Sequence, residues 1–361
     1  MHRNSYMEIN TNNISNNVNK IINHYNNYKY YFGVVKANCY GFGINICDHL
    51  IKSGINYFAV ATLDEALNIR KMHKDIPILC LGIINTNYID LCIKNNITIT
   101  VSNIDYVYDL VKRNNKNLKV HIKINSGMNR LGFDNKKEIN KTYNILKDNN
   151  IFIEGIYSHI YNACNKKDTL NQYKRFENLI SDLNINDIPI VHVNASEALT
   201  LYDKKDYMNG CRLGIIMYGI TNNKELELLS TFRLCSEVIQ INNVKKGQTV
   251  GYNGIYKCDK DELIAVVSIG YADGIIRKNT GRYVYINNKK YIIVGNICMD
   301  MLFVKVNKNV KVGDKVLLIK DNNHLKYISK YLDTIPYEVI CSISERIERK
   351  YIFWQFLIIY L

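Results

Sequence analysis

The stretch that decides the fold is residues 57–73, YFAVATLDEALNIRKMH, where an apolar run is followed at once by a segment with helical spacing. Tyr57–Thr62 lacks alternation of apolar and polar residues, which is typical of a strand buried on both faces. Leu63–His73 places its apolar residues at the three- and four-residue intervals of an amphipathic helix. Together the two segments predict one strand–helix unit.

This unit recurs from residue 30 to about residue 220, with a period of about 25 residues. Alternating strands and helices require a parallel sheet with right-handed crossovers, and eight such units close a (β/α)₈ barrel. An open doubly wound sheet is the alternative, but no G-x-G-x-x-G fingerprint follows the first strand. The expected strands are Phe32–Ala37, Tyr57–Thr62, Ile78–Ile83, Thr98–Ser102, Lys119–Asn125, Phe152–His159, Ile190–Ala195 and Arg212–Met217. The expected helices include Ile44–Ser53, Leu63–His73, Asp105–Lys112, Lys137–Asp148, Leu170–Leu183 and Ser196–Tyr202.

The pattern changes after about residue 228 to short strands joined by turns, with no long helical stretch until near Leu325. A length of 361 residues is enough for two domains. We therefore expect a barrel over residues 9–228 and a mostly β domain over residues 229–361, which residues 1–8 join as a strand.

The charge balance is basic, because 47 Lys and Arg residues exceed 33 Asp and Glu residues and leave a formal charge of +14. Such a balance can indicate nucleic acid, anionic membranes or small anions as partners. Asn, Ile, Lys and Tyr are abundant and share AT-rich codons, so genome composition explains much of the lysine. The 10 cysteines form no C-x-x-C pair, which favours reduced thiols. Without an apolar signal segment or an apolar run of ~18 residues, the chain is expected to be cytoplasmic.

Reactive side chains gather where the expected barrel strands end, which is where barrel enzymes place their catalytic groups. Each has an ordinary structural alternative, such as a snorkelling lysine or a packed histidine. Around one mouth, however, they predict a basic pocket for a phosphorylated ligand, and inward-facing strand ends could not contact a nucleic-acid backbone. These residues are Lys36, Lys123, Arg130, His159, Ser196, Arg212 and Gly214.

Two segments of the expected β domain also stand out. Residues 268–274, SIGYADG, place Tyr271 on a tight turn directly after a strand, and residues 295–301 read GNICMDM. A phenol becomes a useful base only beside a cation that lowers its pKa from about 10. With 28 tyrosines in the chain, this position alone does not establish a catalytic tyrosine.

Taken together, these segments resemble the alanine racemase family. V-V-K-A-N-x-Y-G-x-G at 34–43 and I-G-Y-A-D-G at 269–274 are specific in combination, and further matches follow in the family order at 123–132, 158–159, 192–196, 210–219 and 295–300. The resemblance implies a (β/α)₈ barrel with a β domain and the cofactor pyridoxal 5'-phosphate (PLP). It also implies interconversion of L-alanine and D-alanine, which supplies D-alanine for bacterial peptidoglycan.

The resemblance implies two catalytic residues. Lys36 would hold PLP covalently and exchange the α-proton on one face of the substrate, and Tyr271 would exchange it on the other face. The family supplies this tyrosine from the second subunit of a head-to-tail homodimer, so each active site would be shared. No metal, nucleic acid or membrane is implied as a partner.

The resemblance also implies the contacts to cofactor and substrate. Arg212, paired with His159, would bond the pyridine nitrogen of PLP, and because arginine keeps its proton this would favour plain reprotonation over side reactions. Arg130 and the backbone of Met299 would hold the substrate carboxylate. The expected phosphate contacts are Tyr40, Ser196 and the backbone of Gly214 and Ile215. The expected supporting residues are Cys298, Asp300 and Lys123, which matches a lysine that some members carry as a carbamate.

The chain departs from the family pattern at several positions, of which Glu345 matters most. Many relatives have tyrosine there, touching the phosphate and bordering the substrate side chain. A serine racemase or a broad-specificity amino-acid racemase is therefore the nearest alternative function. A non-catalytic PLP-binding barrel is the alternative of another class, but such barrels lack a β domain with a residue like Tyr271. Three further departures are Phe42, Ala195 and Asn296, where relatives usually have His, Asn and Arg.

Overall fold

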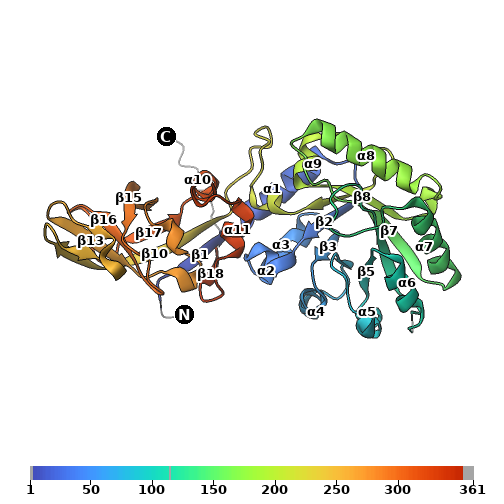
Figure 1. Cartoon of the computed structure of the whole chain (residues 1–361), viewed down its shortest axis with the longest axis horizontal. Coiled ribbons are helices and arrows are strands. Elements are labelled where there is room, and N and C mark those ends of the chain that lie inside the picture. Colours follow the sequence, from blue (N-terminus) through green and yellow to red (C-terminus); the bar gives the residue numbers. More distant parts are fainter. Residues whose placement is uncertain (1–2, 114, 353–361) are drawn as a thin grey trace. The chain divides into compact units, whose positions relative to one another are not determined.

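The computed structural model describes residues 3–113 and 115–352, which form two compact units. The barrel unit comprises Ser15–Cys39 and Ile44–Leu228. The β unit comprises the described residues up to Ile14, the segment Tyr40–Gly43 and the described residues from Leu229 onward. Figure 1 shows strands surrounded by helices in the first unit and mainly strands in the second. The expected (β/α)₈ barrel followed by a mostly β domain is confirmed.

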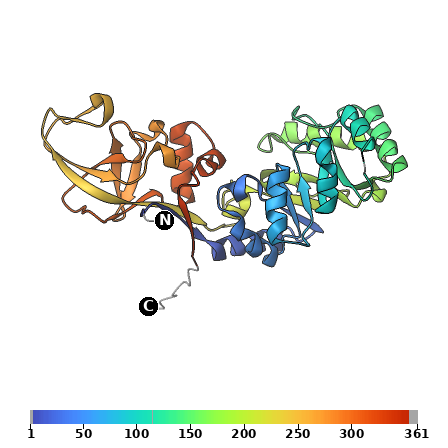
Figure 2. The same ribbon diagram turned by 90° about the horizontal axis from the view of Figure 1, so that it is seen from below.

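Eight parallel strands close the barrel in chain order, and β2 pairs with both β3 and β9. Helices surround these strands, as a second view shows (Figure 2). The strands are β2 (Tyr30–Val34), β3 (Tyr57–Val60), β4 (Ile78–Cys80), β5 (Ile97–Val101), β6 (Lys119–Lys123), β7 (Phe152–Tyr157), β8 (Ile190–Ala195) and β9 (Gly210–Leu213). The helices are α1 (Thr11–His24), α3 (Cys47–Lys52), α4 (Leu63–Met72), α5 (Ile89–Lys94), α6 (Ile104–Val111), α7 (Lys136–Asp148), α8 (Lys166–Ile180) and α9 (Ser196–Leu201).

The strand–helix unit at residues 57–73 folds as its local signals predict. All four residues of β3 are buried, as a strand covered on both faces requires. Thr62 then caps α4 by a capping box, in which its hydroxyl accepts from the Glu65 N–H at 3.3 Å and the Glu65 carboxylate accepts from the Thr62 N–H at 3.2 Å. Two otherwise unpaired amides are thereby satisfied where the strand gives way to the helix.

The expected strands at 32–37 and 212–217 are shorter or shifted in the structure. β2 ends at Val34, two residues before Lys36. β9 begins at Gly210 and ends at Leu213, and residues 215–218 form a 3₁₀ turn. The break falls at Gly214, which directly precedes the 3₁₀ turn. Apolar composition alone could not separate this buried turn from a strand.

The β unit is built on one eight-stranded sheet with the order β13-β16-β15-β14-β17-β10-β1-β18, and β10 also pairs with β13. The N-terminal strand β1 lies between β10, to which it is antiparallel, and β18, to which it is parallel. The strands are β1 (Tyr6–Asn10), β10 (Phe232–Val244), β13 (Glu262–Val267), β14 (Tyr283–Ile286), β15 (Lys289–Val294), β16 (Leu302–Val306), β17 (Lys315–Ile319) and β18 (Glu348–Ile352), with the short pair β11 (Thr249–Val250) and β12 (Tyr256–Lys257). The helices are α10 (Asn322–Leu332) and α11 (Pro336–Cys341).

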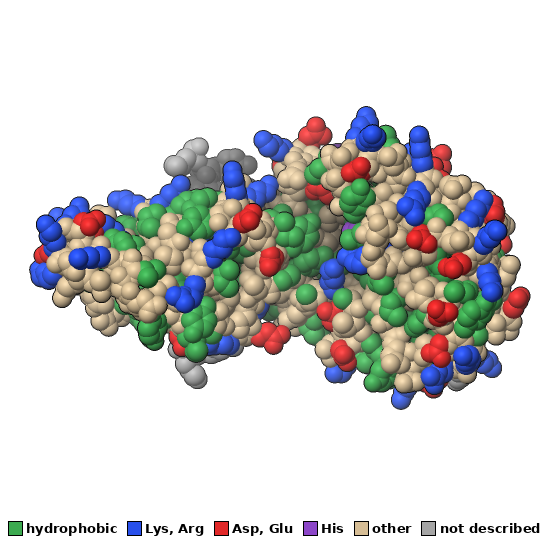
Figure 3. Space-filling model, in the orientation of Figure 1, with side chains coloured by type: hydrophobic (Ala, Val, Ile, Leu, Met, Phe, Trp, Pro, Cys, Tyr) green, Lys and Arg blue, Asp and Glu red, His purple; other side chains and the backbone are tan. Residues whose placement is uncertain are grey.

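The cysteine thiols are free, as the sequence predicts, and the visible face of the barrel unit carries both signs of charge. All ten cysteines carry free thiols. Over the barrel-unit face seen in Figure 3, lysines and arginines are interspersed with acidic residues, and no single sign of charge dominates it. Within residues 3–113 and 115–352, none of the helices is both long and apolar enough to cross a membrane.

Candidate active site

Lys36 begins a left-handed turn directly after β2, labelled α2 (Lys36–Tyr40). Residues 37–40 all have φ between 51° and 56°, although none of them is glycine. Such a run is costly and persists only where surrounding contacts hold it. One contact is a bond of 2.7 Å from the Ala37 N–H to the Glu65 carboxylate, which also caps α4. The capped helix thus fixes the turn that carries the partly buried Lys36 side chain.

Arg212, in β9, is surrounded by neutral acceptors at the ends of neighbouring strands. Its Nη1 donates to His192 Nδ1 at 2.7 Å and to the His192 carbonyl at 2.9 Å. Its Nη2 lies within bonding distance of the Ser158 carbonyl (2.7 Å), the Val193 carbonyl (2.9 Å) and His159 Nδ1 (3.2 Å). Burial lowers the pKa of Arg212 to about 10. Among the described residues none accepts a bond from its Nε, so this N–H is available to a bound molecule.

Positive charge accumulates around His159 without a balancing carboxylate. Burial, followed by the charges of Arg212, Lys123, Arg130 and Lys36, lowers the pKa of His159 to about 2. None of these four cations forms an ion pair with a carboxylate in the described part of the chain. A group of cations at a barrel mouth attracts an anion of matching size. These five residues are brought together in the barrel unit, as the sequence predicts.

Lys123 ends β6 with its side chain inside the barrel. It is only 7% exposed, and its Nζ lies 4.3 Å from the centre of the Tyr157 ring. Burial, with further repulsion from Arg212 and Arg130, lowers the pKa of Lys123 well below its ordinary value. A lysine in this environment favours the neutral, nucleophilic amine.

Arg130 is exposed on a loop that folds back onto the end of β6. The Asn125 N–H donates to the Phe133 carbonyl at 2.8 Å, and the Phe133 N–H donates to the Lys123 carbonyl at 2.9 Å. Gly132 is required where the loop closes, because its φ is 116° and a Cβ would lie 2.7 Å from the Asn125 nitrogen. The loop therefore brings the Arg130 guanidinium back toward the cationic cluster.

Three of the four expected phosphate contacts lie together in the barrel unit. The Gly214 N–H donates to Ser196 Oγ at 3.0 Å, and Ile215 follows Gly214 at the start of the 3₁₀ turn. Tyr40, the fourth, groups with the β unit, where its ring centre lies 6.1 Å from that of Tyr337. The hydroxyl and amides of this small cluster have the chemistry of a phosphate site.

Tyr271 lies on a 3₁₀ turn of the β unit that is joined to the loop at residues 298–300. Its backbone N–H donates to the Cys298 carbonyl at 3.0 Å, and the Ala272 N–H donates to the Met299 carbonyl at 3.0 Å. Gly270 permits this approach, because a Cβ there would lie 2.3 Å from the Cys298 oxygen. The side chains of Tyr271 and Met299 are 42% and 53% exposed. The fold thus brings both expected β-unit site segments together and presents them outward.

A buried carboxylate and an arginine hold these two loops. Asp273 is fully buried, accepts from the Gly270 N–H at 2.9 Å, and pairs with Arg3 at 2.5 Å. Arg346 lies 3.8 Å from Asp273 and pairs with Asp300, the third expected supporting residue. The sequence did not single out Arg346, because its partners lie far from it along the chain.

Sequence reasoning also missed His121 and Glu154, and it included His192 only within the matching segment 192–196, without a role. The three residues form a polar series inside the barrel. The available signal was a charged or imidazole side chain within an otherwise apolar strand. Such a position predicts a partner but does not identify it. Glu345, in contrast, is exposed in the turn before β18.

A (β/α)₈ barrel with cations at its strand ends, followed by a β unit that presents a tyrosine on a turn, defines a class of two-domain barrel enzymes. Family models described as the N-terminal and C-terminal domains of alanine racemase match residues 9–222 and 231–351. The chain belongs to the alanine racemase family.

Individual relatives agree with this assignment. The alanine racemase of Staphylococcus epidermidis is 33% identical, with 93% of each chain covered. The crystal structure of alanine racemase from Bacillus anthracis with bound L-Ala-P superimposes with a TM-score of 0.91 at 32% identity, covering 98% of this chain and 96% of that one. A histidine racemase from Leuconostoc mesenteroides has a TM-score of 0.87 at 23% identity over 97% and 98% of the chains, a likeness of fold alone.

Proposed function

We propose that this chain is a PLP-dependent alanine racemase that interconverts L-alanine and D-alanine and supplies D-alanine for peptidoglycan. The observation that carries the proposal is the environment of Arg212. Its two terminal nitrogens are engaged by strand-end acceptors, its Nε–H has no partner in the described chain, and four cations without carboxylates surround His159.

The residues of the barrel unit fit PLP, which carries a pyridine nitrogen and a phosphate. The free Nε–H of Arg212 suits the unprotonated ring nitrogen, because a guanidinium only donates. Ser196 and the amides of Gly214 and Ile215 suit the phosphate. Lys36 would hold the aldehyde carbon. When bound, PLP withdraws electrons from the substrate Cα and so makes its α-proton acidic.

The remaining roles fall to three side chains. The Nζ of Lys36 takes the proton from one face of the substrate Cα or returns it there, and the Tyr271 hydroxyl does so on the opposite face. Racemisation needs both, because a proton must leave one face and arrive on the other. The Arg130 guanidinium offers a planar fork that matches the substrate carboxylate.

We also propose that Tyr271 acts in the active site of a second copy of the chain. Tyr271 and Met299 lie in the β unit and are about half exposed, which is unusual for catalytic groups in a closed site. Met301 and Ile276, which are close to these residues in the chain, are also exposed apolar side chains. Such a surface favours association with another protein, and a head-to-tail homodimer would place it over the partner's barrel mouth.

Serine, or several amino acids, is the second candidate for the substrate. The specific observation is Glu345, an exposed carboxylate where many relatives have a tyrosine beside the substrate side chain. A polar residue at that position favours a substrate hydroxyl over a methyl group.

Turnover measurements with the purified protein separate the candidates. Added PLP should give a protein-bound absorbance band at a longer wavelength than that of the free cofactor. The loaded protein should convert L-alanine to D-alanine faster than it converts L-serine to D-serine. Faster serine turnover would assign the second candidate. A bound cofactor with no racemisation of either amino acid would instead favour a non-catalytic PLP-binding protein.

A further inference from the structure

A line of buried polar side chains runs through the barrel from Arg212 to Glu154. His192 Nδ1 contacts Arg212 Nη1 at 2.7 Å, and His192 Nε2 contacts His121 Nδ1 at 2.9 Å. The remaining nitrogen of His121, Nε2, faces Glu154 Oε2 at 3.4 Å, which is close enough for charge attraction, although no hydrogen bond forms between them. Both imidazoles are fully buried, and the series belongs entirely to the barrel unit.

As long as Arg212 keeps its position, the hydrogen bonds of this line run in one direction. Arg212 can only donate, so His192 Nδ1 must be the unprotonated nitrogen of a neutral ring. His192 therefore carries its proton on Nε2 and donates to His121 Nδ1, which must also be unprotonated. His121 in turn carries its proton on Nε2, where it faces a carboxylate oxygen.

The surrounding side chains prevent either ring from escaping this arrangement by rotation. His192 is stacked between Phe32, at 4.5 Å, and Tyr157, at 4.7 Å. His121 occupies space that only a glycine leaves open, because a Cβ on Gly155 would lie 2.4 Å from its Cε1. Because the rings are fixed in place, each imidazole can change only its tautomer, that is, which of its nitrogens carries the proton.

Glu154 lies at the end of this line, and its hydrogen-bond donors favour its ionised form. Val120 pairs with Ile153 and His121 pairs with Gly155, so Glu154 is an additional residue on β7. Its Oε2 accepts from the Tyr57 hydroxyl at 2.5 Å and from the Thr98 hydroxyl at 2.8 Å. Both donors favour the ionised carboxylate.

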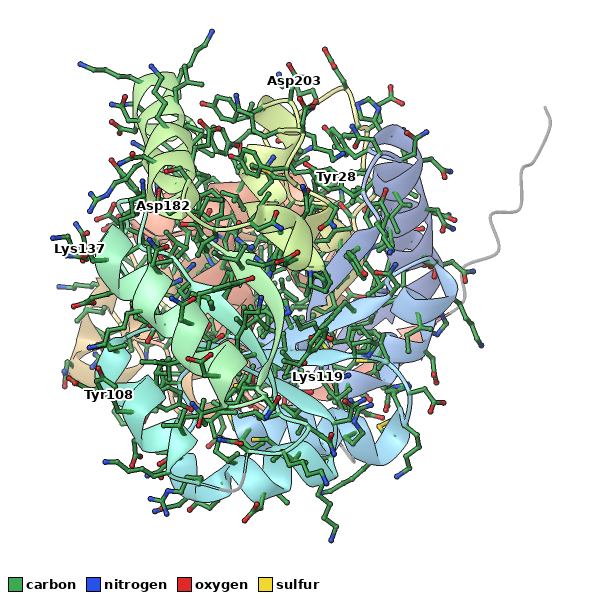
Figure 4. All side chains as sticks on the ribbon, turned by 90° about the vertical axis from the view of Figure 1, so that its right-hand side faces the viewer. Tyr28, Tyr108, Lys119, Lys137, Asp182 and Asp203 are labelled. Atoms are coloured by element: carbon green, nitrogen blue, oxygen red, sulfur yellow. The ribbon has the colours of Figure 1, made fainter. Side chains whose placement is uncertain are left out.

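Solvent reaches the Glu154 end of the line, whereas Arg212 at the other end is buried. Glu154 and Tyr57 line a cavity of about 450 Å³. Glu154 is 12% exposed, and Lys119, at the start of β6, lies 3.9 Å from its other oxygen. In the view of Figure 4, Lys119 lies toward the middle, whereas Lys137 and Asp182 lie toward the edge. The carboxylate can therefore stay ionised although its partners are buried.

We propose that Glu154 is a positioning residue for the cofactor site. Its negative charge holds the proton of His121 on Nε2, which leaves His121 Nδ1 as an acceptor. His192 then keeps its own proton on Nε2, so its Nδ1 remains an acceptor for Arg212. If the order reversed, His192 would present Nδ1–H to Arg212, and two donors would face each other. Arg212 would then shift, and its Nε–H would no longer be held for the pyridine nitrogen. This inference rests on the proposed function only in taking PLP as the ligand that binds Arg212 Nε.

The test is histidine ¹⁵N NMR on the protein without PLP, comparing the unmodified chain with Glu154→Gln. An amide can offer either its oxygen or its nitrogen to His121, so it sets no proton order. We expect the unmodified protein to show single neutral Nε2–H forms for His121 and His192, and Glu154→Gln to show mixed tautomers. Thr98→Val is the matched control, because it removes a different bond to the same carboxylate. It should leave both histidines as they are.

Cofactor affinity provides the second readout. Glu154→Gln should weaken PLP binding on the order of tenfold, because the carboxylate charge that orders the histidine protons is lost, whereas Thr98→Val should stay within about twofold of the unmodified protein. If Glu154→Gln does not fold, Glu154→Met is expected to give the same two changes. Unchanged histidine tautomers and unchanged PLP affinity in a folded Glu154 variant would overturn the proposal. Changes in Thr98→Val as large as those in the Glu154 variant would overturn it as well. Because the NMR needs no cofactor or substrate, it distinguishes failure of this inference from failure of the racemase assignment.

Discussion

Arg346 Nη2 donates to Asp300 Oδ1 at 2.7 Å and so ties the turn before β18 to the loop that carries Met299. The same guanidinium lies 3.8 Å from Asp273, the buried carboxylate in the Tyr271 turn. One side chain therefore joins the two β-unit loops that we assign to the active site. Both loops are already linked by backbone bonds, so Arg346 adjusts their position and does not create it.

Replacing Arg346 tests this positioning. Arg346→Met should lower kcat by about tenfold, because small displacements of a catalytic group carry large rate penalties. The free energy of unfolding should change by less than about 1 kcal/mol, because the pair with Asp300 is exposed on both sides and the buried Asp273 keeps its ion pair with Arg3. Lys350→Met is the matched control, since it removes another exposed pair, with Glu348 at 3.9 Å. Unfolding in urea and steady-state kinetics measure both effects, and a wild-type kcat in Arg346→Met would refute the positioning role.

Much of the barrel was predictable from the sequence because its signals are local. Ile190–Ala195 is a strand with the predicted bounds, since it is a short, largely β-branched run between breaks. The turn at Lys36 was not predictable, because it depends on a Glu65 carboxylate from the next strand–helix unit.

The candidate site shows the same division between local and long-range information. The cations at the barrel mouth could be named from their places at strand ends. The series from Arg212 to Glu154 could not, because its members come from four different strands, β6 to β9, and meet only once these strands pair with one another. Its members are separated by up to 71 residues along the chain in a single contact.

His159 should make the folded protein sensitive to mild acid. Its pKa falls from 6.5 to about 2 on folding, so between these values the unfolded chain binds a proton that the folded chain does not. Stability is therefore lost as the pH falls below about 6.5, by at most about 1.4 kcal/mol per pH unit for this one group. His159→Gln should reduce that slope in urea unfolding measured between about pH 6 and pH 4. An unchanged slope in the variant would show that His159 is protonated in the folded protein.

Lys123 should react reversibly with carbon dioxide. Its buried neutral amine lies close to Arg130 and Arg212, so a carbamate would supply the negative charge that this region lacks. Native mass spectrometry in bicarbonate should show a gain of one CO₂ per chain, and Lys123→Met should abolish that gain. Equal uptake by both proteins would place the modification elsewhere.

Sharing of the active site can be tested by mixing two inactive variants. Lys36→Ala removes the barrel-unit base, and Tyr271→Phe removes the β-unit base. If each site combines Lys36 of one chain with Tyr271 of another, a mixed dimer has one intact site and one doubly defective site. Mixing the two proteins under conditions that allow subunit exchange should restore activity well above that of either alone. No recovery, with exchange demonstrated by mass spectrometry, would mean that each site uses one chain only.

The most direct test of the racemase assignment is the fate of L-alanine in heavy water. With PLP bound, the unmodified protein should form D-alanine that carries deuterium at Cα, because the departing proton and the arriving one come from different groups. Lys36→Ala and Tyr271→Phe should each lower this rate by about a hundredfold or more, as expected when a general base is lost. Racemisation at the wild-type rate in either variant would contradict the two-base account, and the absence of both deuterium exchange and D-alanine in the unmodified protein would contradict the function itself.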